Sequence, residues 1–305
     1  MATCTAHGGG HDTYPALSII QRMDADMLAS EVSQLVQLDT VSDRAAAPSF
    51  LPPASQRNMR ATHKLLRRFY PRLFAAATVD VINEYSLLLT LPPSSHGEQH
   101  SATSTGDGER PALFMCHLDV VPIANGTEQD WGKAAGCDAC GPFSGNIYGG
   151  YVWGRGAQDM KQYCAALLHA AERLLSEPEG PEGGAAWQRS RTLVFALGHD
   201  EECGGEAGHA AIVETLEERG LTDLEFVHDE GLPIMPAGSS VINPDFGLAL
   251  VGLAEKGYLT VRVECQSAGG HASQPPDAGS AITLLAAALQ AIHTQRPTPA
   301  LVLLV

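Results

Sequence analysis

Residues 193–205 read LVFALGHDEECGG, and this stretch decides the fold class. Its first five residues are apolar on both faces, which is typical of a strand in a mostly parallel sheet covered by helices. In such sheets ligands bind beyond the carboxyl ends of the strands. The acids Asp200, Glu201 and Glu202 follow at that end, and three adjacent carboxylates repel one another unless a positive charge lies among them. The stretch predicts a cation-binding turn, with a solvated acidic turn as the alternative.

Apolar strands and helices alternate on both sides of this stretch. In chain order, the pattern predicts helices over 23–38 and 56–69, extended structure over 79–91, a strand over 112–116, a helix over 158–175, a helix over 206–218 and a strand over 225–227. The expected fold class is therefore α/β, with a mostly parallel sheet flanked by helices.

Two more predicted strand ends carry candidate ligands. ALFMC is followed by His117 and Asp119, which share a face of an extended segment, so that the carboxylate can orient a metal-bound imidazole. LEFV is followed by His228, Asp229 and Glu230. Taken alone, a His-x-Asp pair is also explained by a simple hydrogen bond, and an acidic turn by solvation.

Asp159 lies in the segment WGRGAQDMK at a predicted helix start, where an aspartate usually caps the helix. Its two oxygens can instead bridge two cations. Together with His117, Glu202 and Glu230 it forms a nitrogen and oxygen ligand set of the kind that zinc, cobalt or manganese accepts. If Glu202 binds a cation, the adjacent Glu201 stays free to take a proton from water.

The pattern changes near residue 256. Residues 258–264 alternate apolar and polar side chains, which predicts a half-exposed strand, and 277–293 is expected to be a helix with Asp277 near its start. We therefore expect one domain over 1–255 and the beginning of a second over 256–305. A further motif, SAGGHAS around His271, falls in this second part, and a glycine-rich turn explains it equally well.

The composition excludes some partners. The chain has 19 Lys and Arg residues against 35 Asp and Glu, a formal charge of -16, which repels nucleic acid and anionic membranes. The first twenty residues show neither the basic nor the apolar region typical of a signal peptide, and no apolar run of 18 or more residues occurs in the sequence. Seven cysteines without the dense spacing of a secreted scaffold fit reduced thiols. We expect a soluble, cytoplasmic protein.

The motifs HLDVVP, PFSG with YVWGRGAQDMK, GHDEECGG, DEG and GGHAS occur in this order. In this arrangement the chain resembles the M20 family of zinc peptidases and amidohydrolases. The spellings GHDEE, DEG and WGRG are most similar to the group that contains carboxypeptidase S and the N-fatty-acyl-amino-acid hydrolases. The resemblance implies a zinc-dependent hydrolase that cleaves the amide bond of dipeptides, short peptides or N-acyl amino acids. An aminoacylase-type deacylase is the alternative.

The resemblance also implies roles for individual residues around two zinc ions. The expected roles are His117 and Glu230 on one zinc, Asp229 as the alternative to Glu230, Glu202 on the other zinc, Asp159 bridging both, Glu201 as general base, Asp119 orienting His117 and His271 reaching the substrate carbonyl. The bond from Asp159 to Met160 is expected to be cis. His199, His209 and His228 are expected to be hydrogen-bonded neighbours of the site.

Three expectations concern departures from the family pattern. The family supplies another histidine ligand beyond a lid domain, and no position here matches it, so we expect a C-terminally truncated chain, with an inactive remnant as the rival interpretation. On this interpretation 1–255 is the catalytic domain and 256–305 part of the lid, through which the resemblance implies a homodimer. The pair Cys137 and Cys140 ahead of PFSG is interpreted as a local surface elaboration.

Overall fold

The computed structural model describes residues 25–94, 109–176 and 187–231, together with 234–235, 237–238, 247–253, 257, 260–271, 273 and 279–295. The chain divides into two compact units, Met1–Gly231 and Leu232–Val305. Among the described residues, no helix is both long and apolar enough to cross a lipid bilayer. The assignment of a catalytic domain over 1–255 and a lid over 256–305 stays a prediction.

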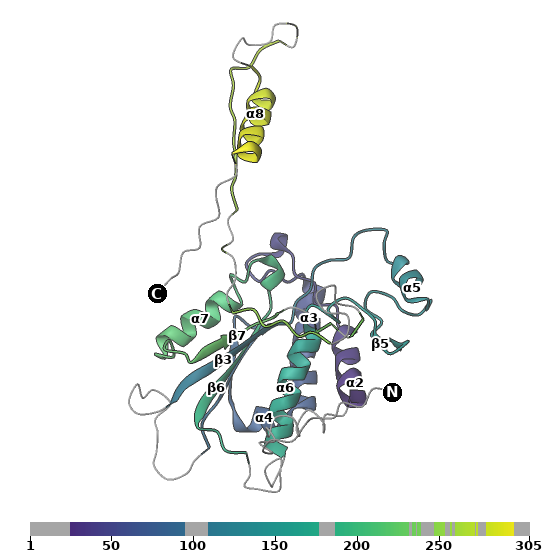
Figure 1. Ribbon diagram of the computed structural model, residues 1–305, viewed down its shortest axis with the longest axis vertical. Coiled ribbons are helices and arrows are strands. Elements are labelled where there is room, and N and C mark those ends of the chain that lie inside the picture. The colour runs from purple at the N-terminus through teal and green to yellow at the C-terminus, as the bar shows by residue number, and fades with distance from the viewer. Residues whose placement is uncertain are drawn as a thin grey trace. The chain divides into compact units, whose positions relative to one another are not determined.

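A five-stranded sheet forms the centre of the first unit (Figure 1). Its strand order is β1 (Thr78–Ile82), β2 (Ser86–Leu91), β6 (Arg191–Gly198), β3 (Glu109–His117) and β7 (Phe226–His228). Strand β6 is parallel to β3, and β3 is parallel to β7, whereas β2 is antiparallel to both of its neighbours. Strands β1, β3, β6 and β7 therefore run in one direction, which confirms the predicted mostly parallel sheet.

The segment 79–91, predicted as extended, is a hairpin of β1 and β2. Asn83 and Glu84 at its turn have φ angles of 46° and 68°, the left-handed conformation that a tight hairpin with correctly twisted strands requires. Asparagine adopts this conformation more readily than most residues, but the same apolar pattern continues on both sides of it. The pattern therefore indicated strand structure without indicating the turn.

Helices cover both faces of the sheet (Figure 1). On one face lie α2 (Ala25–Val36), α3 (Pro53–Phe69), α4 (Pro71–Ala76) and α6 (Lys161–Ser176), and on the other lies α7 (His209–Glu218). The alternation of β2 assigns its side chains accordingly: Leu87, Leu89 and Leu91 join the core beneath α2, α3, α4 and α6, whereas Leu88 joins the core beneath α7. The strands are thus buried on both faces, as their apolar sequences predict.

The long connection from β3 to α6 carries α5 (Asp130–Ala135) and a small hairpin of β4 (Ile147–Tyr148) and β5 (Tyr151–Val152). A disulfide joins Cys137 and Cys140, whose Cα atoms lie 5.4 Å apart, a separation that a disulfide spans. The expectation of reduced thiols is therefore wrong for this pair. The other described cysteines, Cys116, Cys164, Cys203 and Cys265, are free.

The second unit contains α8 (Ala281–Thr294), which overlaps the helix predicted over 277–293. Its N-cap is Ser280, whose hydroxyl accepts a hydrogen bond from the Thr283 amide, and the predicted cap Asp277 lies outside the described residues. The strand predicted over 258–264 is not present in its described part, since residues 260–264 belong to no strand. Alternation alone does not create a strand, because a strand also needs a partner for its backbone hydrogen bonds.

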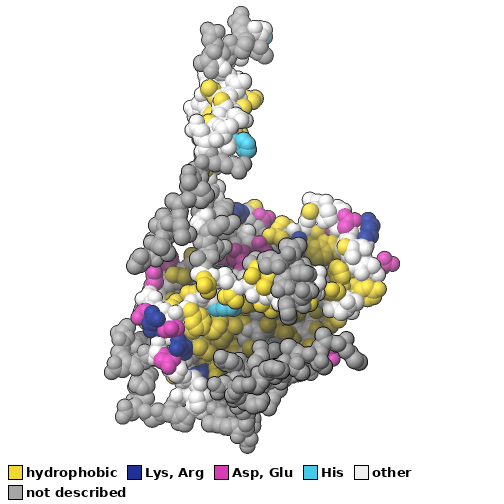
Figure 2. Space-filling model, viewed as in Figure 1, with side chains coloured by type: hydrophobic (Ala, Val, Ile, Leu, Met, Phe, Trp, Pro, Cys, Tyr) yellow, Lys and Arg dark blue, Asp and Glu magenta, His cyan; other side chains and the backbone are white. Residues whose placement is uncertain are grey.

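Ion pairs join the amino ends of the parallel strands. Arg191 at the start of β6 contacts Glu109 at the start of β3, and Arg110 contacts Glu225 just before β7, at N···O distances of 2.7 and 3.0 Å. Figure 2 shows basic and acidic side chains side by side at this edge of the molecule. The acids at the amino ends of the strands are therefore neutralised by arginines.

Candidate metal centre

The carboxyl ends of β6, β3 and β7 lie next to one another in the sheet. His117 at the end of β3 is the register partner of Gly198 at the end of β6, and His228 at the end of β7 pairs with Phe114. The turns that follow these strands therefore emerge from one edge of the sheet, which is where ligands bind in this architecture. This arrangement brings together the motifs GHDEE, HLD and HDEG.

The His117 side chain lies at the centre of the acidic cluster. It is 1% exposed, and its Nε2 atom lies 3.0 Å from Asp159 Oδ1, 3.8 Å from Glu201 Oε2 and 3.9 Å from Glu230 Oε2. The three carboxylates come from three separate segments of the chain. His117 is thus the point at which the predicted motifs converge.

Asp119 fixes the geometry around His117. The Asp119 carboxylate is fully buried, lies 3.4 Å from His117 Nδ1, and accepts hydrogen bonds from the backbone amides of Glu201 and Glu202 at 3.1 Å. It also accepts a hydrogen bond of 2.7 Å from the buried hydroxyl of Ser42. One carboxylate therefore joins the β3 turn to the GHDEE turn, and the role of Asp119 in orienting a metal-bound His117 stays a prediction.

Ser42 was not predicted from the sequence. It lies in the segment after α2, far from the other motifs in sequence, and its backbone amide donates to the Val120 carbonyl. The neighbouring Thr40 hydroxyl donates to the Leu118 carbonyl. A lone serine between a valine and an aspartate gives no signal in one sequence, so only the folded chain identifies it.

Two groups of side chains have ligand atoms close enough to hold a metal ion. The groups are His117 with Asp159 and Glu230, and His117 with Glu201 and Glu202, and within each group the ligand atoms lie within 4.8 Å of one another. All four predicted ligands are therefore brought together. Glu201, predicted as the general base, is also within reach of an ion, whereas Asp229 is in neither group and accepts a hydrogen bond from the Glu230 amide.

The electrostatics of the cluster favour the binding of cations. Burial raises the pKa of Glu202 to about 7, and the Asp159 carboxylate adds to the shift. Burial also raises the pKa values of Glu201 and Glu230. For His117, burial opposes protonation, but the carboxylates of Asp119, Glu201 and Asp159 outweigh it and raise its pKa to about 10. The cluster thus holds protons that a divalent ion would displace.

No lysine or arginine in the described part of the chain forms an ion pair with Asp159, Glu201 or Glu230, and His117 is their one ion-pairing partner there. Glu201 and Glu202 are half-buried, and carboxylates removed from water are normally paired with cations or bound to a metal. Nitrogen from one histidine and oxygen from several carboxylates is a donor set that zinc accepts. The residues present therefore fit divalent metal ions.

The other histidines of this edge contact protein groups. His199 Nδ1 lies 2.6 Å from the Ser86 hydroxyl, His209 Nε2 lies 3.1 Å from the Cys116 carbonyl, and His228 Nδ1 binds the Tyr163 hydroxyl. This agrees with their expected role as neighbours. His271 belongs to the second unit, where its Nδ1 atom lies 2.8 Å from the Ser273 hydroxyl, and its contact with a substrate stays a prediction.

The segment that carries Asp159 is held firmly at its base. The Asp159–Met160 peptide bond is cis, as expected. Lys161, which follows it, is buried and donates to the carbonyls of Leu35 and Leu38 at the end of α2. The Gly156 backbone packs against Lys161, because an added Cβ there would lie 3.1 Å from its Cδ atom. This anchoring lysine was not predicted from the sequence.

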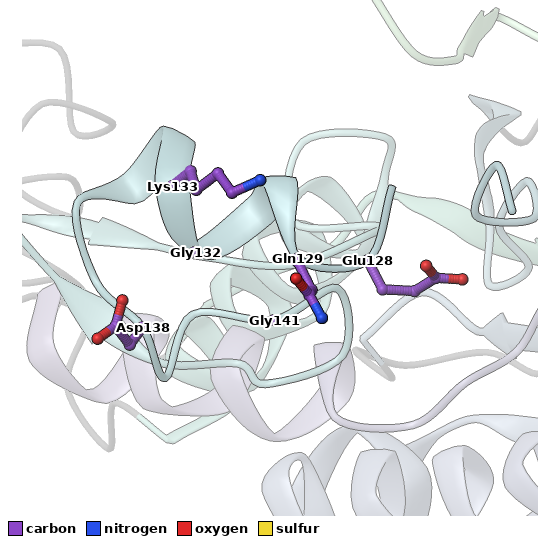
Figure 3. Close-up of a pocket in the computed structure, with 6 residues that line it drawn as sticks. All are labelled: Glu128, Gln129, Gly132, Lys133, Asp138 and Gly141. Carbon is purple, nitrogen blue, oxygen red and sulfur yellow. The ribbon is translucent and has the colours of Figure 1, made fainter. Parts of the chain in front are cut away.

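A separate pocket is formed by α5 and the loop after it (Figure 3). It is lined by Glu128, Gln129, Gly132, Lys133, Asp138 and Gly141. In Figure 3 the charged ends of Glu128, Lys133 and Asp138 lie apart from one another and do not converge on a common point. None of the residues predicted for the metal centre lines this pocket.

Comparison with known proteins identifies the family. Residues 113–302, more than half of the chain, match the model of peptidase family M20/M25/M40. The chain belongs to this family. The matched region begins in β3 just before His117 and includes Asp159, Glu201, Glu202 and Glu230. The resemblance inferred from the order of the motifs is confirmed.

The relatives of this M20/M25/M40 family chain include two named groups. It is 35% identical to N-fatty-acyl-amino acid synthase/hydrolase PM20D1.1 of Danio rerio over 93% of its own length and 47% of that protein. It is 31% identical to carboxypeptidase S of Saccharomyces cerevisiae over 81% of its own length and 38% of that protein. The chain therefore spans less than half the length of these curated relatives.

A solved structure of human carnosine dipeptidase 1 also matches the chain. The match has a TM-score of 0.46 and 17% identity, and it covers 73% of this chain and 41% of the dipeptidase.

Proposed function

We propose that this chain carries a metal-dependent amide hydrolysis site. His117, Asp159, Glu202 and Glu230 would hold two divalent ions, zinc by preference, with cobalt or manganese acceptable to the same donors. The observation that carries the proposal is the pair of ligand groups that share His117. Both groups lie around His117, whose Nε2 atom can bind one ion, and the Asp159 carboxylate has two oxygens with which it could bridge that ion to a second one.

When bound, the ions would polarise an amide carbonyl and make water a better nucleophile near neutral pH. Glu201 would then act as general base, accept a proton from the attacking water and return it to the leaving amine. Burial raises the pKa of this carboxyl, which makes its ionised form a stronger base. Its backbone amide donates to Asp119, so the turn that carries the base is fixed relative to His117.

Asp119 would keep His117 in the tautomer that binds metal. The Nδ1 atom of His117 lies 3.0 Å from the Asp119 backbone carbonyl and 3.4 Å from its carboxylate. Both partners accept hydrogen bonds, so they place the proton on Nδ1 and leave the Nε2 lone pair directed at Asp159 and Glu230. The geometry supports a ligand role for Nε2.

The substrates we propose are dipeptides, short peptides or N-acyl amino acids, from which hydrolysis releases a free amino acid. Support comes from the names of the relatives, one a carboxypeptidase and the other an N-fatty-acyl-amino acid synthase/hydrolase. His271 would reach the substrate carbonyl from the second unit, and a homodimer through that unit is part of the same proposal. A cytoplasmic location is proposed on the sequence alone.

The test combines metal content with activity. Zinc per chain is measured by elemental analysis after gel filtration, and hydrolysis is followed with Gly-Leu and with an N-acyl amino acid. We expect bound zinc, release of the amino acid, loss of both on treatment with a chelator, and recovery on addition of zinc. A chain that binds no divalent metal would contradict the proposal.

A further inference from the structure

Tyr163 and His228 connect two elements of the metal centre. Tyr163 lies in the first turn of α6, and His228 is the last residue of β7. Their rings stack with centroids 5.6 Å apart and an interplanar angle of 23°, and the Tyr163 hydroxyl binds His228 Nδ1. The contact therefore combines an aromatic stack with a hydrogen bond.

These two residues flank the ligands Asp159 and Glu230. Asp159 lies immediately before α6, and Glu230 lies just beyond β7. Both carboxylates belong to the ligand group that includes His117. The Tyr163–His228 contact thus joins the helix that follows one ligand to the strand that precedes the other.

Within the described ranges of the chain, few other contacts hold strand β7. It has three residues, all exposed, and in the described part of the chain it pairs with β3 alone, at the edge of the sheet. Its remaining aromatic contacts are those of Phe114 with Phe226 and with His228, at 5.7 and 6.0 Å. A short edge strand moves more easily than a central one, so the position of Glu230 depends on its side-chain contacts.

The hydrogen bond joins the Tyr163 hydroxyl to His228 Nδ1. Burial raises the pKa of Tyr163, so the hydroxyl keeps its proton. A phenylalanine at residue 163 would keep the stack and remove the hydroxyl, which makes the bond separable from the packing.

We propose that Tyr163 is a positioning residue that, through His228, sets the separation of Asp159 and Glu230 and thereby the affinity of this ligand group for a divalent ion. The inference rests on the proposed metal site. It assigns no contact between Tyr163 and the metal or the substrate. Its effect is on how well the two ligands are placed before an ion binds.

The experiment measures zinc affinity by competition with a chromogenic chelator. The variants of the whole chain are Tyr163→Phe, His228→Phe, the double variant, and Tyr151→Phe as a control on the exposed β4–β5 hairpin. Each single change at the contact is expected to weaken zinc binding about tenfold, as is typical for residues that orient metal ligands. The double variant is expected to lose no more than the larger single loss, because both changes remove one hydrogen bond.

The melting temperature of each metal-free variant separates positioning from folding. We expect Tyr163→Phe and His228→Phe to weaken zinc binding while the melting temperature of the metal-free chain stays close to that of the wild type. Tyr151→Phe should change neither the zinc affinity nor the melting temperature. Equal zinc affinity in wild type and Tyr163→Phe, or losses that add in the double variant, would overturn the inference while leaving the metal site in place. Absence of zinc binding by the wild type would instead reject the proposed function.

Discussion

The acidic side chains at the amino ends of the parallel strands have arginine partners, whereas those of the cluster at the carboxyl ends have none in the described part of the chain. At the amino ends, Glu109 and Glu225 lie beside Arg191 and Arg110. At the carboxyl ends, Glu201, Glu202, Glu230 and Asp159 surround His117 without an arginine or lysine partner among the described residues. The same sheet therefore has one edge whose charges are balanced by the protein and one whose charges are left for cations.

The pKa directions express this difference. Hydrogen bonds from Ser190 and Arg191 lower the pKa of Glu109, so this carboxyl is stabilised as an anion. Burial and neighbouring carboxylates raise the pKa of Glu202, so that carboxyl is destabilised as an anion. Acidic side chains at a strand end thus indicate a functional site when their counter-charge is missing, and a solvated surface when it is present.

The largest expected effect is on catalysis. Glu201→Gln keeps the shape of the side chain and removes the base, so hydrolysis is expected to fall about a thousandfold, within the range for loss of a general base. The measurement is kcat for an N-acyl amino acid or dipeptide at saturating zinc. Glu206→Gln, at an exposed position in the same loop, is the matched control and should keep its activity. Equal activity in Glu201→Gln and wild type would remove the proposed base.

The next effect is on stability. Asp119→Ala leaves the buried Ser42 hydroxyl and two partly buried backbone amides without their acceptor, which is expected to lower the free energy of unfolding by about 2–4 kcal/mol. Urea denaturation of the metal-free chain measures it. The exposed Asp138→Ala should change stability by less than about 0.5 kcal/mol. A similarly small change for Asp119→Ala would show that this carboxylate does not organise the two turns.

A third prediction distinguishes Glu230, the proposed ligand, from its neighbour Asp229. Glu230→Gln removes the charge of an exposed side chain and is expected to weaken zinc binding about tenfold or more, with less than about 0.5 kcal/mol change in metal-free stability. Asp229→Asn should keep its hydrogen bond to the Glu230 amide and change zinc affinity less. The reverse order of affinities would make Asp229 the ligand.

The smallest expected effect is on how stability depends on pH, and its sign is opposite for Glu202 at the carboxyl ends of the strands and Glu109 at their amino ends. The pKa of Glu202 is raised from 4.5 to about 7, so the folded metal-free chain holds more protons than the unfolded chain between these pH values, and its stability falls as pH rises through this window. The pKa of Glu109 is lowered, so its contribution is present above its unfolded pKa and is lost as pH falls.

Thermal melts of metal-free wild type, Glu202→Gln and Glu109→Gln between pH 4.5 and 7.5 measure this difference. Relative to that of Glu202→Gln, the melting temperature of the wild type is expected to fall by about 2 °C as pH rises. The fall is small because the Glu202 carboxyl is partly exposed. Relative to Glu109→Gln, any change should have the opposite sign. The same sign for both variants would contradict the distinction between the edges.

Much of the fold was predictable because runs of apolar residues indicate buried strands, and apolar residues three or four positions apart indicate helices. The strand that precedes GHDEE and the helix over 158–175 follow directly from the pattern of side chains. The proximity of His117, Glu202 and Glu230 was predictable because the carboxyl ends of parallel strands meet at one edge, whereas their role as ligands stays a prediction. The turn at Asn83 and Glu84 was not predictable, since Asn-Glu is not one of the glycine-containing pairs that mark a tight hairpin in a sequence.

The supporting residues could not be predicted from the sequence. Ser42, Lys161 and Tyr163 act through contacts with segments far away in the chain, and a serine, a lysine or a tyrosine is compatible with many other positions. The disulfide of Cys137 and Cys140 depends on a local turn that brings their Cα atoms within bonding distance. Tertiary structure supplies this information, and a single sequence does not.

The most direct measurement of the central claim is anomalous diffraction at the zinc absorption edge from crystals of the protein grown with zinc. We predict peaks within about 2.0–2.2 Å of His117 Nε2 and of oxygens of Asp159, Glu202 and Glu230, the usual zinc distances. Peaks confined to other residues, with this edge of the sheet empty at saturating zinc, would contradict the account.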